Sequence, residues 1–312
     1  MHAFPHLLAL TAPLFLLVLA GYLLMRGLHW PAAVSDALAQ FVFSVAVPAL
    51  LFRMMSGFSR LPPVDARLLL AYFGGCAIVF AAGRVAAFAL FRMDGAAQSV
   101  FAIGGVFANT VLLGVPLAQV LLGEPAMPTV SLVVVFNALL LWTLVTASVE
   151  WARRREMSWR GLARTAGDVV TNPVIGSILA GTLWSFTGLA LPGVVDRTLE
   201  MVAQAATPLA LIALGMGLAE FRAREGLAAS AAIAAIKLAA FPLVVLGLAR
   251  ALALPALETQ AVVMIASLPV GANVYLMARE FSTLEGPVAA SLVLSTALAA
   301  LTTPLIVAVA TA

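Results

Sequence analysis

The chain carries one sequence pattern twice. Leu19-Ala20-Gly21 recurs as Leu179-Ala180-Gly181, and the same offset of 160 residues relates several other short motifs. These further matches are Thr11 with Thr171, Pro13 with Pro173, Asp36 with Asp196, Pro48 with Pro208, Ser131-Leu132-Val133 with Ser291-Leu292-Val293, and Thr143 with Thr303. One register extends over the whole chain, so we expect two copies of one structural unit.

Composition places these copies in a membrane. Of the 312 residues, 63% are hydrophobic and only 10% are charged, whereas soluble domains carry about 25% charged residues. Most of the apolar stretches are long enough for the roughly 20 residues that a membrane-spanning helix needs. We expect an all-α integral membrane protein with ten spans, near 5–25, 34–57, 66–91, 95–123, 127–151, 172–187, 192–219, 226–252, 255–282 and 284–311.

Five spans per copy fix how the two copies are related. An odd number of crossings brings the second copy into the membrane upside down, and inverted repeats are typical of secondary transporters. We therefore expect a first five-helix repeat over 1–151, a cytoplasmic linker over 152–170 and a second, inverted repeat over 171–312.

The arginines predict the orientation, because Lys and Arg accumulate in cytoplasmic loops. With both termini outside, the cytoplasmic side holds most of them: Arg26, Arg92, Arg153, Arg154, Arg155, Arg160, Arg164, Arg222, Arg224 and Arg279. The outer side then holds Arg53, Arg60, Arg67, Arg197 and Arg250. We interpret the Arg153-Arg154-Arg155 cluster as a topology determinant and expect no nucleic-acid partner.

Several other functions find no support in the sequence. The first 25 residues contain neither Lys nor Arg, which favours a retained span over a signal peptide. Cys76 is the only cysteine, and we expect it to be a small core residue rather than a redox group. His2, His6 and His29 lie near the ends of the first span, so no catalytic cluster, metal site or cofactor site is predicted.

Two spans are interrupted halfway by residues that disfavour a helix. The fourth is broken at 108–116, where Asn109-Thr110 precedes Gly114-Val115-Pro116, and the ninth at 267–273, within Ser267-Leu268-Pro269-Val270-Gly271-Ala272-Asn273. Pro removes a backbone donor and Gly is a poor helix former. The 160-residue register aligns Asn109 with Pro269, so both breaks occupy the same place in their repeats. Kinks in two packed helices are the alternative interpretation.

Unwound backbone at membrane depth must be covered by protein or face a water-filled cavity. We therefore expect the two breaks to face each other, so that two half-helix N-termini meet and form an anion site. Its predicted side-chain donors are Asn109, Thr110, Ser267 and Asn273. Neither break contains Asp or Glu, which disfavours a carboxylate-built cation site and agrees with an anionic substrate.

Lys237, the only lysine, lies near the centre of the eighth span. An ionisable side chain at that depth is a functional candidate. It has three open roles: pairing with a substrate carboxylate, pairing with a carbonyl at a helix break, or replacing a coupling cation; it is also the candidate for proton coupling. The alternative is a lysine that snorkels to the surface, but about 16 Å of helix separates it from the cytoplasmic end. For Arg84 we expect snorkelling, and for Glu200 a possible role as partner of a buried donor.

The chain resembles the auxin efflux carrier family, in particular its short bacterial branch of PIN-like transporters. The resemblance covers nearly the full chain. It rests on Asn109-Thr110 with Gly114-Val115-Pro116, on Asn172-Pro173-Val174-Ile175-Gly176, on Pro208-Leu209-Ala210-Leu211-Ile212-Ala213-Leu214-Gly215, and on Pro269-Val270-Gly271-Ala272-Asn273-Val274-Tyr275 followed by Ala278-Arg279-Glu280.

The resemblance implies a bacterial inner-membrane carrier with the architecture of bile-acid and sodium/proton carriers. Helices 1, 2, 6 and 7 would form a scaffold and homodimer interface, and helices 3–5 and 8–10 a moving transport domain. Asn109, Pro116, Pro269 and Asn273 would hold a substrate carboxylate, with Lys237 beside them. Two departures stand out: Val111 replaces a glycine frequent in relatives, and residues 72–78 lack the acidic partner found in plant carriers.

The patterns predict a secondary transporter of small organic anions, and the resemblance implies substrates such as malonate or malate and elevator-type alternating access. A sodium-coupled symporter of the bile-acid type is the first alternative, although the breaks supply few sodium ligands. A membrane enzyme or sensor without transport is the second.

Overall fold

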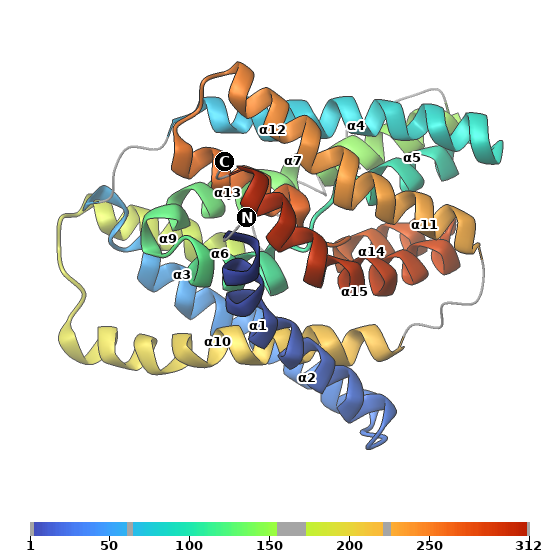
Figure 1. Ribbon diagram of the computed structural model, residues 1–312. Helices are drawn as coiled ribbons and strands as arrows, with labels where there is room; N and C mark the ends of the chain where they lie inside the picture. Colours follow the sequence, from blue (N-terminus) through green and yellow to red (C-terminus); the bar gives the residue numbers. More distant parts are fainter. Residues whose placement is uncertain (1–2, 61–64, 155–172, 221–225, 311–312) are drawn as a thin grey trace.

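The computed structural model describes residues 3–60, 65–154, 173–220 and 226–310, and within these ranges the chain is helical with no strands beyond one isolated bridge (Figure 1). Most of the predicted linker lies outside the described residues, together with Arg155, Arg160, Arg164, Arg222 and Arg224.

Most of the helices lie within the apolar stretches expected from the sequence. Along the chain they are α1 (Ala3–Arg26), α2 (Ala32–Phe41), η1 (Val42–Ala46), α3 (Val47–Met55), η2 (Phe58–Arg60), α4 (Arg67–Phe91), α5 (Gly95–Gly104), η3 (Thr110–Gly114), α6 (Val115–Leu121), η4 (Glu124–Ala126), α7 (Met127–Arg154), α9 (Pro173–Phe186), α10 (Gly193–Glu220), α11 (Leu227–Ala235), η5 (Ile236–Ala240), α12 (Phe241–Ala251), α13 (Ala256–Ser267), α14 (Ala272–Glu280) and α15 (Glu285–Ala310).

The number of continuous spans is smaller than the ten expected. Seven helical segments of the described residues are long and apolar enough to cross a membrane, and three shorter apolar helices cover Thr110–Leu121, Pro173–Phe186 and Ala256–Ser267. Two of the shorter ones adjoin the predicted breaks. The protein is therefore a multi-pass, all-helical membrane protein.

Two helix pairs with equivalent positions in the 160-residue register pack at very short distance: α1 against α10, and α9 against α3. A Cβ atom on Gly21 of α1 would lie 2.1 Å from the carbonyl oxygen of Ile212, and one on Gly181 of α9 would lie 2.6 Å from that of Phe52. The offset that relates the two glycines also relates Phe52 to Ile212. The repeated glycine thus lets two backbones touch in both halves.

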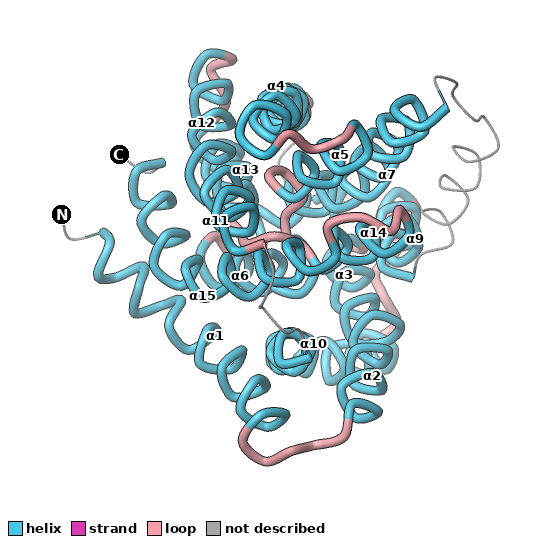
Figure 2. The backbone as a smooth tube through the Cα atoms, turned by 90° about the vertical axis from the view of Figure 1, so that its right-hand side faces the viewer, coloured by secondary structure: helices cyan, strands magenta, loops and turns pink. Residues whose placement is uncertain are grey.

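The ends of α3, α9 and α10 are joined by polar contacts. Arg53 Nε lies 2.7 Å from Asp196 Oδ1, and its Nη2 lies 3.9 Å from Glu200 Oε1. The Ser59 and Ser185 hydroxyls are 2.8 Å apart, and Ser59 N–H donates to Ser185 Oγ at 2.7 Å. Glu200 Oε2 also accepts from the exposed Arg197 Nη1 at 3.2 Å, so Glu200 has an exposed and a half-buried arginine as partners instead of a fully buried donor. Figure 2 shows this group of helices beside a second group built from α4, α5, α7 and α11–α15.

Three π-helical turns interrupt the spans, and each is followed by a proline. η1 ends two residues before Pro48, η3 two residues before Pro116, and η5 two residues before Pro242. A proline lacks an N–H and its ring crowds the carbonyl four residues back, so a widened turn before it relieves the clash. Two of these turns contain predicted site residues.

Candidate functional site

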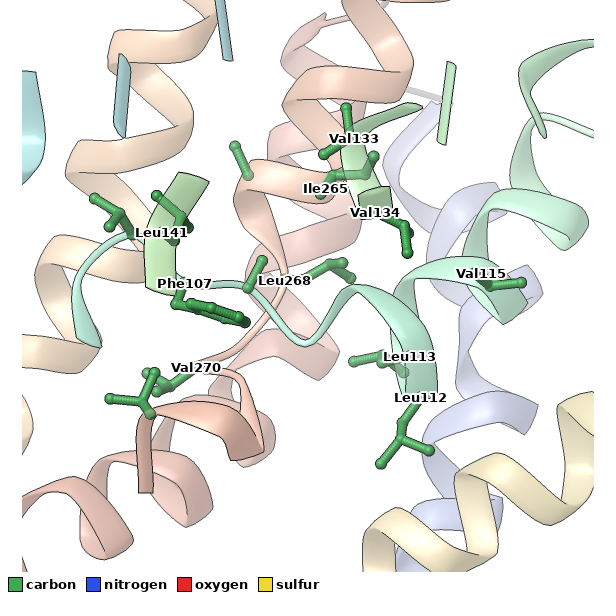
Figure 3. Packing of buried hydrophobic residues seen from close by; sticks show 14 of the residues in the cluster. Phe107, Leu112, Leu113, Val115, Val133, Val134, Leu141, Ile265, Leu268 and Val270 are labelled. Atoms are coloured by element: carbon green, nitrogen blue, oxygen red, sulfur yellow. The ribbon is translucent and has the colours of Figure 1, made fainter. Parts of the chain in front are cut away.

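The two predicted breaks are present and contact each other in the interior. α5 ends at Gly104 and η3 begins at Thr110, while α13 ends at Ser267 and α14 begins at Ala272. Between these helices the two extended segments run antiparallel, joined by a bridge between Ala108 and Val270 (Figure 3). The predicted contact between the breaks is therefore observed.

Two backbone hydrogen bonds join the segments. Asn109 N–H donates to the Pro269 carbonyl at 3.0 Å, and Gly271 N–H donates to the Phe107 carbonyl at 2.9 Å. Antiparallel neighbours normally exchange both bonds, but Pro269 has no N–H to return. The Asn109 carbonyl instead accepts from Gly114 N–H at 3.1 Å, which closes the π turn. Pro269 thus interrupts its own helix and also leaves the Asn109 carbonyl available for the π turn of the first break.

The second break is satisfied by side chains from neighbouring helices. Val270 N–H donates to Ser295 Oγ at 3.1 Å, and Thr303 Oγ1 donates to the Ser267 carbonyl at 2.9 Å. Both side chains belong to α15. Ser267 Oγ is itself used within α13, where it donates to the Met264 carbonyl at 2.7 Å. The Ser267 hydroxyl is therefore a helix-end contact in this conformation.

Lys237 contacts the end of α13, next to the second break. Its side chain is fully buried in η5, and Nζ donates to the Ala266 carbonyl at 2.6 Å. Nζ also lies 4.9 Å from the centre of the Phe241 ring. The ammonium thus sits at the C-terminal end of α13, where the helix dipole is negative. The sequence left three roles for Lys237 open, and the structure shows one of them: Lys237 pairs with a carbonyl at a helix break. Its side chain does not reach the surface, so the snorkelling alternative is wrong.

Arg84, which we expected to snorkel, is half-buried and has hydroxyl partners on neighbouring helices. Its Nη1 donates to Ser148 Oγ on α7, and the Ser148 hydroxyl lies 2.8 Å from that of Ser99 on α5. Arg84 therefore links α4 to α7 and, through Ser148, to α5.

The two predicted asparagines occupy different surroundings. Asn109 is 6% exposed and its Nδ2 has no hydrogen-bond partner among the described residues, whereas Asn273 is exposed. Asn273 shares an exposed face of α14 with Leu276 and Arg279. Thr110 and Pro116 are buried on the other half-helix. One amide donor is thus hidden and unused, and the other lies on an open surface.

Apolar side chains pack around the buried side of the crossover. Phe107, Leu113, Ile265, Leu268 and Val270 are 3% exposed or less, and Figure 3 shows them around the crossing segments. Water is excluded from this side, so burying a polar group there costs free energy unless the group has a hydrogen-bond partner.

The sequence analysis missed one buried polar residue near this packing. Asn137 on α7 is 1% exposed, and its Oδ1 has no hydrogen-bond partner among the described residues. Three and four residues away on the same helix face, Val134 and Leu141 lie beside the crossover in Figure 3. An Asn amid apolar residues in the fifth span was the signal, since polar side chains inside a membrane are costly.

The starts of the two half-helices supply backbone N–H groups at the crossover. The first amides of η3 and α14 lie at helix starts, where no carbonyl of the same helix is in reach. These N–H groups carry partial positive charge, and the unpaired Asn109 amide adds a donor. Within the residues the structure describes, no group of three or more His, Cys, Asp or Glu side chains gathers as a metal site would require.

Comparison with known proteins shows the family of the chain. The membrane transport protein family, which includes the auxin efflux carriers, matches residues 6–307. The chain belongs to this family. It is also 28% identical over 298 residues to a protein of Rhizobium meliloti (strain 1021) named "Putative malonate transporter", covering 94% of this chain and 92% of that protein. As a member of the family it is a membrane transporter and not an enzyme.

Proposed function

We propose that this member of the auxin efflux carrier family transports small organic anions, namely mono- or dicarboxylates of the size of malonate or malate. The observation that carries the proposal is the crossover, where two half-helices begin at crossing segments that contain no acidic residue and the buried Asn109 amide has no partner among the described residues. The likeness to a protein named for malonate supports the dicarboxylate class.

In this proposal the substrate carboxylate binds between the starts of η3 and α14. Asn109 Nδ2 and the Thr110 hydroxyl donate from the buried side, and Asn273 donates from the exposed side. Pro116 and Pro269 act through the backbone, because they fix the π turn and the crossing. Ser267 acts through its carbonyl, which Thr303 holds in place.

The inverted repeat is part of the same proposal, with repeats over 1–151 and 171–312 and a linker over 152–170. The inverted repeat is supported by the residues that pair at the crossover. Asn109 hydrogen-bonds Pro269, its counterpart in the 160-residue offset, and the two segments run antiparallel. A two-fold axis through that pair would relate the two halves.

We further propose an elevator mechanism in the bacterial inner membrane, with both termini on the periplasmic side. The scaffold comprises α1, α2, η1, α3, η2, α9 and α10 and forms a homodimer, and the remaining helices move. The close glycine contacts and the Arg53–Asp196 pair lie inside the proposed scaffold, which fits a rigid unit.

The test is uptake of a labelled carboxylate panel into proteoliposomes, for the parent, Asn109→Ala and Asn273→Ala. Both variants should lose most transport, since each removes a donor to the carboxylate. Ser177→Ala, in the scaffold helix α9, is the control and should transport like the parent. Full transport in both asparagine variants would remove the crossover from the proposal, and a steep dependence on sodium would favour the bile-acid-type symporter.

Lys237 is the proposed coupling residue, because a lysine can lose its proton when desolvated. A pH jump across the proteoliposome membrane should change the parent's transport rate and leave that of Lys237→Gln unchanged. A pH response that persists in Lys237→Gln would exclude Lys237 as the proton site.

A further inference from the structure

A cavity lies between α1 and α15, away from the crossover. It has a volume of about 500 Å³, and its wall is formed by apolar side chains of α1 and α15 with a single contribution from α10. Both helices are candidate membrane spans and pack against each other (Figure 2). The groove therefore lies at hydrocarbon depth.

The lining is unsuited to a charged or strongly polar ligand. All of its side chains are uncharged, and Thr296 already donates to the Leu292 carbonyl at 2.7 Å. Apart from the Tyr22 hydroxyl at one end, the lining offers a carboxylate no further side-chain donor, so the groove is unsuited to be a second substrate site.

The dimensions suit one extended hydrocarbon chain. Along α1 the lining runs from Leu8 to Tyr22, which corresponds to about 21 Å of helix within a hydrocarbon core of about 30 Å. Tyr22 lies one turn from the end of α1, where an amphipathic ring meets the head-group level. The small side chains of Ala12 and Ala297 leave the space between the helices open.

The groove is continuous with the apolar outer surface of the same helices. Leu16 and Leu19 on α1 are 62% and 49% exposed, and Leu301 on α15 is 58% exposed; all three also line the groove. An empty recess loses dispersion contacts on one side. A flexible hydrocarbon chain can follow such a recess and restore these contacts.

We infer that this groove binds one acyl chain of a bilayer lipid, with the lipid head group at the Tyr22 end. α1 belongs to the proposed scaffold and α15 to the proposed moving part, so the bound chain would lie along the sliding surface. That consequence rests on the proposed function, while lipid binding itself does not.

The test uses the full chain in phosphatidylcholine vesicles that contain a phosphatidylcholine with a diazirine in its acyl chain. After illumination, cross-linked peptides are mapped by mass spectrometry. We expect cross-links enriched at α1 and α15 groove residues over those at Leu183, an exposed leucine of α9. Transport is not part of the readout, so failure of the proposed function would leave the result interpretable.

Two groove-filling variants, Ala12→Trp and Ala297→Trp, should each lose this enrichment. Ala20→Trp is the matched control, because Ala20 is exposed on α1 but does not line the groove, and it should retain the enrichment. Variants that elute as single species in detergent are compared. Cross-linking no stronger than at Leu183, enrichment that survives both fillers, or cross-links to a second protein copy at this face would overturn the inference.

Discussion

At the scale of single residues, the two crossover asparagines are alike in sequence and unlike in surroundings. Asn109 is buried beside apolar side chains, and Asn273 lies on the exposed face of α14. The residue types and their mirrored breaks predicted that both belong to one site. Their exposure depends on which half-helix faces open space in a given conformation, and no local pattern encodes that.

This asymmetry predicts different access to the two positions. In a Cys76→Ala background, Asn273→Cys should react quickly with a membrane-impermeant maleimide, and Asn109→Cys should react slowly or not at all. Under the proposed orientation, with Arg279 at the cytoplasmic side, the reaction should occur in inside-out vesicles and fail in right-side-out vesicles. The measurement is mass addition over time, and Leu276→Cys, on the same exposed face, serves as the positive control. Equal labelling of both asparagine positions would contradict the described conformation.

At the scale of helices, glycine and proline explain most of the departures from regular structure. The prolines Pro48, Pro116 and Pro242 each follow a π turn, and Pro269 removes one bond from the crossover. The sequence analysis marked Pro116 and Pro269 as helix breakers. It could not distinguish a π turn from a kink, because that choice depends on which carbonyls find partners, such as Asn109 with Gly114.

The repeated glycines give a prediction about helix packing. Gly21→Ala and Gly181→Ala should each lower the free energy of unfolding by about 1–3 kcal/mol, because the added methyl group forces two backbones apart. Gly176→Ala on α9 has no atom within 4 Å of the new Cβ and should be neutral or stabilising by roughly 0.5–1 kcal/mol. Unfolding of the purified protein in detergent, followed by circular dichroism, compares the three. Equal stability of all variants would refute the close contacts.

At the scale of the whole molecule, the 160-residue register gave the most specific structural prediction. It placed Asn109 against Pro269, and the backbone hydrogen bond joins that pair. It could not foresee that the halves differ in how their breaks are satisfied. Lys237 and Ser295, which serve the second break, have Ala77 and Val135 at the equivalent positions. The contact between the two breaks was thus predictable from repetition, whereas the way each break is satisfied depends on substitutions that depart from the repetition.

The proposed division into scaffold and moving helices leads to a final prediction. Thr207 on α10 donates to Gln119 on α6 at 3.0 Å, a hydrogen bond between the two proposed parts. Sliding of one part against the other has to break this contact. In a Cys76→Ala background, cross-linking Gln119→Cys to Thr207→Cys with a short bifunctional thiol reagent should therefore stop carboxylate transport, and a reducible reagent should allow recovery.

The matched control is the pair Ser59→Cys and Ser185→Cys, whose native hydroxyls are 2.8 Å apart inside the proposed scaffold. Cross-linking this pair should leave transport unchanged, because its two helices move as one body. The extent of each cross-link is measured by peptide mass spectrometry, and transport by uptake of labelled substrate in the same proteoliposomes. A fully cross-linked Gln119–Thr207 pair that transports at the parent rate would rule out sliding at this surface, since a fixed distance between α6 and α10 is incompatible with it.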